Sequence, residues 1–211
     1  MEGNPMYKSG VKVDDFIESL VNEADIEIEI PMTAWLRWLN AVEQFAYTEI
    51  LKDYVLTELN LETVPVDVID LRILTVPPEA SAVQYDDVMK VYGENGTEIP
   101  RGGASSAYEF PEKNLYYGNA LGQLVLSTLE EQARIGIVYR LRPALKTEEN
   151  MDDLEVALPP EYLDMAAAKM RGEAYKIANE DQLAAKWLQD YNMQVENFKV
   201  WAASRNERFG A

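Results

Sequence analysis

The chain of 211 residues contains neither cysteine nor histidine. Without cysteine there is no disulfide, no thiolate nucleophile and no cysteine-based metal site. Without histidine the chain lacks the commonest general base and the commonest transition-metal ligand. Acid–base chemistry by Asp, Glu, Lys or Ser stays open. We nevertheless expect a protein that is not an enzyme and holds no cofactor and no metal ion.

Long apolar runs are also missing. No window approaches the ~18 consecutive apolar residues that a membrane-spanning helix needs, so we expect no membrane partner. The first residues, MEGNPMYKSG, have no apolar core and therefore do not resemble a signal peptide. These two absences predict a chain that is made in the cytoplasm and stays soluble.

The charge is strongly one-sided, with 19 Lys and Arg against 37 Asp and Glu and a formal net charge of −18. Such a surface repels nucleic acid and anionic membranes, which argues against DNA binding over the whole molecule. The simplest interpretation is an acidic protein that its charge keeps from aggregating. Hydrophobic residues at 47% exclude a wholly disordered chain.

The segment from Thr33 to about Thr57 is predicted to be one helix. Its apolar residues cover roughly 180 to 200° of a helical wheel, more than the ~100° that one core-facing stripe needs. Two contact surfaces would account for this width. We expect Trp35, Leu39 and Val42 to face the core, and Trp38 and Phe45 to face a neighbouring subunit, with the alternative that both of these are simply core.

The middle of the chain has β character. Residues 64–78 are rich in β-branched side chains and bracketed by prolines. Asn95-Gly96 is typical of a hairpin turn, whereas 85–92 fits either a strand or a short helix. Successive antiparallel strands are predicted at residues 107–110, 114–118, 123–127 and 133–142.

Helical patterns return near the C-terminus, as they also occur over residues 13–24. Pro159-Pro160-Glu161 is typical of a helix start, and an apolar stripe runs from Leu183 to Ala202. We therefore predict an α+β fold. An α-helical bundle would be formed discontinuously by 1–63 and 148–211, with an inserted antiparallel β-rich domain at 64–147.

Few motifs point to chemistry. The glycine-rich RGGASS at 101–106 lacks the lysine and the strand-to-helix switch of a phosphate loop. The acidic runs at 148–149 and 152–153 lack the spacing and the glycine of a calcium loop, so a solvated linker is expected there. No pair of carboxylates stands out as a glycosidase pair, although so acidic a chain does not exclude one.

Two stretches depart from the acidic background. Residues 132–147 contain Arg134, Arg140, Arg142 and Lys146 and no acid. They would form either a basic stripe that meets an acidic neighbouring subunit or cations that balance acids of the same subunit. The C-terminal tail combines Arg205 and Arg208 with Phe209, and is either a docking segment or an irrelevant end.

The order of these features resembles that of tailed-bacteriophage head-to-tail adaptor proteins. The resemblance covers most of the chain, least of all residues 79–106. It rests on the following stretches: FIESLVNEAD, LRWLNAVEQFAYTEI, VPVDVIDLRIL, NLYYG, IGIVYRLRP and the long C-terminal run from VALPPEYLDMAAAK to QVENFK. It is a likeness of order and pattern, in which a Trp-Leu-Asn helix leads through a β-rich middle to a Leu-Pro helix start and a final amphipathic helix.

The resemblance implies a structural virion protein of the neck. Its copies would form a ring, usually twelve-fold, between the portal protein and the tail or a stopper (head-completion) protein, and DNA would pass through the lumen without specific binding. Members commonly reach the portal through the C-terminal segment, here Trp201 to Ala211, which assigns portal docking to Trp201, Arg205, Arg208 and Phe209.

Two other classes of function remain open. An acidic monomeric module outside the virion, such as a regulator or a nucleic-acid mimic, would present its acids in a regular exposed array. A hydrolase would need a cleft that pairs two carboxylates. The residue pattern alone does not exclude either of them.

Overall fold

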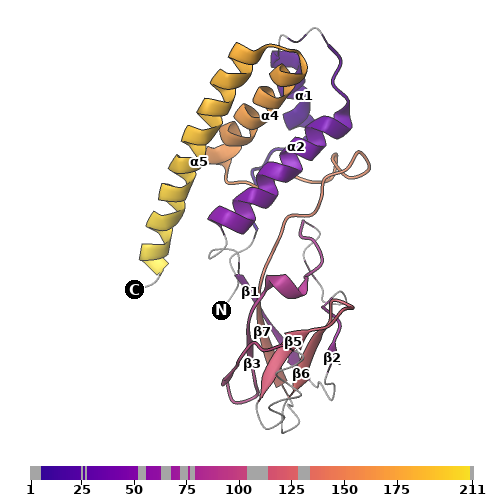
Figure 1. Ribbon diagram of the computed structural model, residues 1–211, viewed down its shortest axis with the longest axis vertical. Helices are drawn as coiled ribbons and strands as arrows, with labels where there is room; N and C mark the ends of the chain where they lie inside the picture. Colours follow the sequence, from indigo (N-terminus) through magenta and orange to yellow (C-terminus); the bar gives the residue numbers. More distant parts are fainter. Residues whose placement is uncertain are drawn as a thin grey trace. The chain divides into compact units, whose positions relative to one another are not determined.

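The computed structural model has helices together with two antiparallel sheets, so the predicted α+β class is confirmed (Figure 1). It describes residues 6–24, 26, 28–51, 56–62, 68–71, 76, 79–103, 114–127 and 134–209. For residues 56–62, 134 and 205–209 it describes the backbone alone.

The chain divides into two compact units. A helical unit comprises Met6–Tyr54 and Pro143–Ala211, and a β unit comprises Val55–Arg142. The helical unit is therefore assembled from both ends of the chain, with the β unit inserted. Its boundaries differ from those predicted, because residues 55–63 belong to the β unit and residues 143–147 to the helical unit.

Four helices form the helical unit: α1 (Val13–Glu23), α2 (Met32–Phe45), α4 (Leu163–Ile177) and α5 (Asp181–Phe209). Helix α4 packs against both α2 and α5. The apolar faces that meet there are among the least exposed parts of the chain, with Leu39, Met165 and Phe198 fully buried. Helix burial of this kind, more than intrinsic propensity, stabilises helices of ordinary length.

Helix α2 ends earlier than predicted. It passes into one π-helical turn, η1 (Ala46–Ile50), and the chain then forms strand β1 (Leu56–Glu62). The predicted helix to Thr57 is therefore wrong in its last residues. The reason is pairing, since all seven residues of β1 lie opposite β7 (Arg134–Arg140) in antiparallel register.

The hairpin of α4 and α5 begins where the prolines predicted a helix start. A 3₁₀ turn, η4 (Pro160–Tyr162), leads directly into α4. Asn179 turns the chain between the two helices with a positive φ of 61°, a conformation that asparagine adopts more readily than most residues. Gly172 allows the close approach, because a Cβ there would lie 2.8 Å from the side chain of Leu188. Figure 1 shows α5 continuing well past the start of α4.

The larger sheet of the β unit has the strand order β1-β7-β3-β4. Strand β3 (Val88–Tyr92), which follows the short 3₁₀ turn η3 (Tyr85–Asp87), pairs with β7 through a register shift between Val88 and Lys90. It pairs on its other side with β4 (Glu98–Ile99). Between β3 and β4 the predicted Asn95-Gly96 turn is confirmed, with Gly96 at a φ of 72°.

The smaller sheet has the order β2-β6-β5, formed by Val68–Ile69, Leu124–Ser127 and Leu115–Gly118. The predicted strands at 114–118, 123–127 and 133–142 are found as β5, β6 and β7. Strands β5 and β6 pair in antiparallel register, but β7 belongs to the larger sheet, so the predicted succession of β6 and β7 in one sheet is wrong. The strand predicted at 107–110 lies outside the described residues.

Candidate assembly surface

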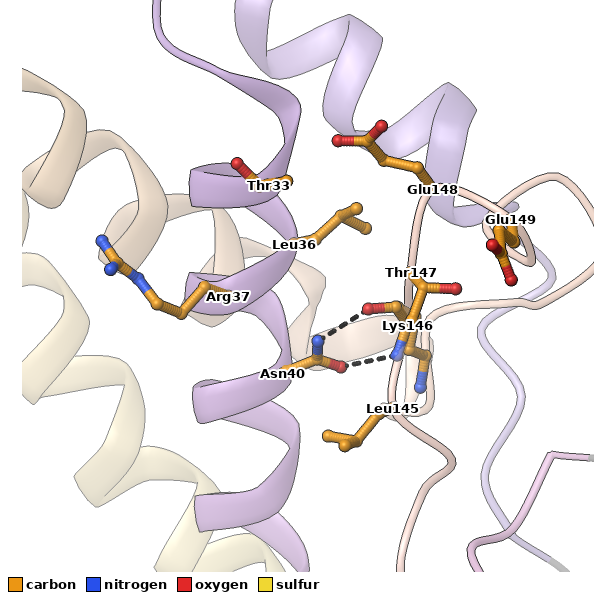
Figure 2. A pocket seen from close by; sticks show the side chains of 9 residues that line it. All are labelled: Thr33, Leu36, Arg37, Asn40, Leu145, Lys146, Thr147, Glu148 and Glu149. Carbon is orange, nitrogen blue, oxygen red and sulfur yellow. Dashed lines mark hydrogen bonds between the residues drawn. The ribbon is translucent and has the colours of Figure 1, made fainter.

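The polar edge of α2 holds the segment that returns from the β unit. The Asn40 side chain donates from Nδ2 to the Lys146 carbonyl at 2.9 Å and accepts from the Lys146 N–H at 2.8 Å. One turn further on, Gln44 donates to the carbonyl of Pro143 at 3.0 Å. These bonds hold residues 143–146 alongside the helix, and Figure 2 draws the two bonds between Asn40 and Lys146.

The same segment is anchored inside the unit by a buried ion pair. Lys146 Nζ donates to Glu43 Oε2, and the N–H of Ala157 donates to Glu43 Oε1 at 2.7 Å. Burial raises the pKa of Glu43, while the charge of Lys146 and the bonds from Lys146 and Ala157 act in the opposite direction. Since the lysine charge is matched inside the unit, it contributes little to the surface above it.

A pocket of about 670 Å³ lies between α2 and residues 145–149. Figure 2 shows Leu36 on the α2 side of the pocket and Leu145 on the loop side. The hydrogen bonds between Asn40 and the Lys146 backbone lie between them, and the Arg37 guanidinium is turned away from the loop. Leu145 is 60% exposed. Leu36 is only 3% exposed, so Leu145 is the leucine that this pocket leaves open to solvent.

Acidic side chains stand on the loop side of this pocket. Glu148 and Glu149 line it and are exposed, and neither forms an ion pair with the described part of the chain. The loop itself is held by a network of turns, in which the N–H of Thr147 donates to Asn150 Oδ1 at 2.8 Å. Among the described residues, no cluster of three or more acids is arranged to hold a metal ion.

A second open surface is the outer face of α5. Met193 is 54% exposed and Val200 is 70% exposed, although the opposite face of the same helix buries Val195, Phe198 and Ala202. Two residues seven positions apart lie on one side of a helix about 10 Å from each other. Beside Val200, Lys199 pairs with Glu196 at 2.7 Å, and both side chains are exposed.

The charge of α5 also differs from that of the chain. Its 29 residues hold four Lys or Arg and four Asp or Glu, a net charge of zero, whereas the whole chain carries −18. The helix is thus a neutral surface on an acidic molecule. Another acidic molecule would meet less repulsion there than elsewhere.

The apolar residues of α2 had been divided into a core set and a pair expected to face a neighbouring subunit, Trp38 and Phe45. Trp35, Leu39 and Val42 are core residues, as predicted. Trp38 is only 8% exposed and packs edge-on against Trp35, with ring centroids 5.3 Å apart. Its own chain covers it, so Trp38 presents little surface to another copy, whereas Phe45 is half-buried.

At least one arginine of the predicted basic stripe, Arg142, forms an ion pair within its own chain. Arg142 Nε donates to Asp87 Oδ1, whose carboxyl is 2% exposed. Arg140 lies at the end of β7, with Nη2 3.5 Å from the sulfur of Met89. The side chain of Arg134 lies outside the described residues. For Arg142 the geometry fits the interpretation that the cation balances an acid of its own chain.

The C-terminal residues assigned to docking are helical in backbone, since α5 extends to Phe209. Trp201 belongs to an aromatic cluster and is half-buried, with ring centroids 5.4 Å from Tyr162, 5.5 Å from Phe198 and 5.9 Å from Tyr7. The side chains of Arg205, Arg208 and Phe209 lie outside the described residues.

The sequence interpretation missed Leu145, Met193 and Val200. For the two residues of α5 a signal was available, because they recur seven residues apart on the side opposite the apolar stripe. Leu145 had no such signal, since it lies in an irregular segment whose position depends on Asn40 and Glu43.

No protein-family model matches the chain, and no curated protein matches it either. Within the described residues, no helix is both long enough and apolar enough to cross a membrane.

Proposed function

We propose that the chain is a head-to-tail adaptor of a tailed bacteriophage. Copies of it, twelve in the usual arrangement of such proteins, form a ring in the neck of the virion. The ring binds the portal protein on one side and a tail or stopper protein on the other. The protein is made in the cytoplasm of the host bacterium and acts without a cofactor.

The observation that carries this proposal is exposed apolar surface on the helical unit of an acidic chain. Leu145, Met193 and Val200 are all more than half exposed. Isolated exposed apolar residues are common, but here they border a pocket and a neutral helix. A protein whose task is to assemble needs such surfaces, because its net charge of −18 otherwise keeps copies apart.

The architecture supports the same function. A helical unit built from both chain ends, with a β unit inserted, follows the order of features on which the resemblance rests. A lumen lined by acidic subunits would repel the phosphate backbone, so DNA would slide through it without sticking. The function then depends on shape and charge, and requires no catalytic site.

Binding to a portal ring tests the proposal. The chain would be mixed with purified portal protein from the same phage, and complexes would be examined by sedimentation and negative-stain electron microscopy. We expect a ring of added density on one face of the portal. A chain that stays monomeric and never joins the portal would instead favour an acidic binding module outside the virion.

Removal of residues 203–211 tests the docking segment. The deletion leaves Trp201 and its aromatic cluster in place, so the helical unit should keep its fold. We expect portal binding to weaken at least tenfold while the circular dichroism and melting temperature change little. Unchanged portal binding would remove Arg205, Arg208 and Phe209 from the docking surface.

A further inference from the structure

We infer that the turn between β3 and β4 is a site of spontaneous chemical modification, at which the side-chain amide of Asn95 is hydrolysed to a carboxylate. The reaction needs only water as co-reactant, and the inference does not rest on the proposed function. Asparagine deamidates most readily when glycine follows it, because glycine has no Cβ to hinder attack by its own backbone nitrogen. Asn95 is the only asparagine of the chain that precedes a glycine.

The reaction proceeds through a cyclic imide. The backbone nitrogen of Gly96 loses its proton and attacks the side-chain carbonyl carbon of Asn95. A new C–N bond closes the imide, and the amide nitrogen leaves as ammonia together with that proton. Water then opens the imide at either of its two carbonyls, which gives aspartate or isoaspartate. Each product adds one negative charge to a chain whose net charge is −18.

The turn leaves both reacting residues accessible. Asn95 and Gly96 are exposed, and the Asn95 side chain forms no hydrogen bond with the described part of the chain. Apart from the chain neighbours of Gly96, no atom lies within 4 Å of the place where a Cβ of that residue would stand. The side chain of Asn95 can therefore rotate towards the nitrogen of Gly96 without displacing a packed neighbour.

The hydrogen bonds of the turn oppose the reaction. The Gly96 N–H donates to the Gly93 carbonyl at 2.9 Å, and the Gly93 N–H donates to the Thr97 carbonyl at 2.9 Å. The first bond must break before the nitrogen of Gly96 can lose its proton. Since β4 is only two residues long, this opening can stay local. Loss of one ordinary hydrogen bond slows the reaction about two- to tenfold relative to the unfolded chain.

Asn119 provides a comparison within the same unit. It also lies in a hairpin turn, between β5 and β6, but its side chain is fixed. Its Oδ1 accepts from the N–H groups of Leu121 at 2.9 Å and Gln123 at 3.0 Å, and its Nδ2 donates to Gln123 Oε1 at 2.7 Å. Ala120 follows it, and the Cβ of Ala120 hinders attack. We therefore expect Asn119 to persist while Asn95 is converted.

Isoaspartate at position 95 should loosen β4. Its backbone runs through the former side chain and is longer by one methylene group, so the turn no longer fits the pairing of Ile99 with Val91. The segment after β4 also carries the Arg101 side chain, whose Nε donates to Tyr85 Oη at 3.0 Å. We expect faster hydrogen exchange at the N–H of Ile99 in the isoaspartate form.

Incubation of the full chain at mildly alkaline pH provides the first test, because proton loss from the backbone nitrogen is then favoured. Trypsin cleaves after Lys90 and Arg101, so Asn95 is the only asparagine in its peptide. We expect this peptide to gain the mass difference between aspartate and asparagine, with an isoaspartate fraction that isoaspartate methyltransferase labels. The peptide of Asn119 should stay unchanged, and Asn95→Gln should abolish the signal.

Two results of this incubation would overturn the inference. One is an Asn95 that stays intact in the folded chain while it is converted in the urea-unfolded chain. The other is earlier conversion of any other asparagine of the folded chain. In urea we expect Asn95 to react about two- to tenfold faster than in the folded chain, because the hydrogen bond from the Gly96 N–H is absent there.

Ala120→Gly provides the sharper test, because it creates a second Asn-Gly pair whose asparagine side chain is held by hydrogen bonds. In the folded variant we expect Asn119 to react at least about fivefold more slowly than Asn95, since its side-chain bonds must break first. In urea the two asparagines should react at similar rates. Equal rates in the folded variant would show that the free side chain of Asn95 is not what makes it reactive, and would overturn the inference.

Discussion

Each of the two units contains a buried ion pair, and the two pairs differ in how far they are buried. Each buries a carboxylate against a cation supplied by the segment that joins them: Glu43 pairs with Lys146 in the helical unit, and Asp87 pairs with Arg142 in the β unit. The helical pair is almost completely buried, with side-chain exposures of 2% for Lys146 and 0% for Glu43. In the β unit, Arg142 is still 29% exposed.

This difference in burial indicates how much each unit depends on its pair. An unpaired charge in a dry interior is costly, whereas one that water can reach is partly solvated. The joining segment is therefore held firmly by the helical unit and more loosely by the β unit. Single substitutions in the two ion pairs test this conclusion.

The largest effect is expected for Lys146→Met. It leaves Glu43 buried without its cation and should lower the free energy of unfolding of the helical unit by about 3–5 kcal/mol. All four tryptophans, at positions 35, 38, 187 and 201, belong to this unit, so their fluorescence during urea unfolding measures the loss. The double variant Glu43→Gln/Lys146→Met should recover much of it. A loss of stability no greater than that of Arg142→Met would contradict the expected difference between the two pairs.

The Lys146→Met variant should also lose stability as pH rises. Burial already raises the pKa of Glu43 above its ordinary 4.5, and loss of the lysine should raise it further. Above pH 4.5 the unfolded chain releases this proton while the folded chain keeps it, so the free energy of unfolding falls with increasing pH. Unfolding measured between pH 4 and pH 8 should show this slope, and the double variant with Glu43→Gln should lack it.

A smaller effect is expected for Arg142→Met. Asp87 would lose its cation but keep the N–H bond from Gln84 at 3.0 Å, and water could replace the half-exposed guanidinium. We expect a loss of about 1–2 kcal/mol, localised in the β unit. Hydrogen exchange over residues 135–140 would detect it, while the tryptophan fluorescence transition should stay in place. A loss of stability as large as that of Lys146→Met would mean that burial of the ion pair does not determine how strongly a unit depends on it.

Each unit has a glycine in close contact with a side chain, and we expect the two glycines to differ in the cost of substitution by alanine. A Cβ at Gly118 would lie 2.6 Å from the rigid ring of Tyr85, whereas one at Gly172 would meet the flexible end of Leu188 at 2.8 Å. We expect Gly118→Ala to cost about 1–3 kcal/mol. Gly172→Ala should cost less, because the gain of about 1 kcal/mol in helix propensity offsets part of the clash. In a Tyr85→Ala background the cost of Gly118→Ala should shrink, as a double-mutant cycle would measure.

The smallest effect on stability is expected for Lys199→Glu. Its partner Glu196 and its own side chain are exposed, so the free energy of unfolding should change by less than about 0.5 kcal/mol. Thermal unfolding at a protein concentration too low for association would check this. A large loss of stability would mean that Lys199 supports the fold.

Much of the fold was predictable from short patterns. Strands β5, β6 and β7 and the helices α1, α4 and α5 were all recognised, because the residues within each element carry its period. Strand β1 was missed. Apolar residues continue at helical spacing from Ile50 through Tyr54, and only β7, more than seventy residues later in the chain, makes 56–62 extended.

The candidate surfaces were less predictable than the fold. The wheel of α2 correctly placed Trp35, Leu39 and Val42 in the core, while a second surface towards a neighbouring subunit stays a prediction. It did not indicate that Trp38 would be only 8% exposed within its own chain. Which side of a wide apolar arc stays open depends on elements distant in sequence, and one helix contains no information about them.

By itself the sequence determined the class of molecule: an acidic α+β protein without cysteine or histidine, whose helical ends flank a β-rich middle. Composition and local period suffice for this, because each is a property of neighbouring residues. Only the tertiary structure decided that Glu43 and Lys146 meet in the interior and that Trp38 is covered. It also decided that Leu145, Met193 and Val200 remain open, because burial is set by contacts between residues far apart in the chain.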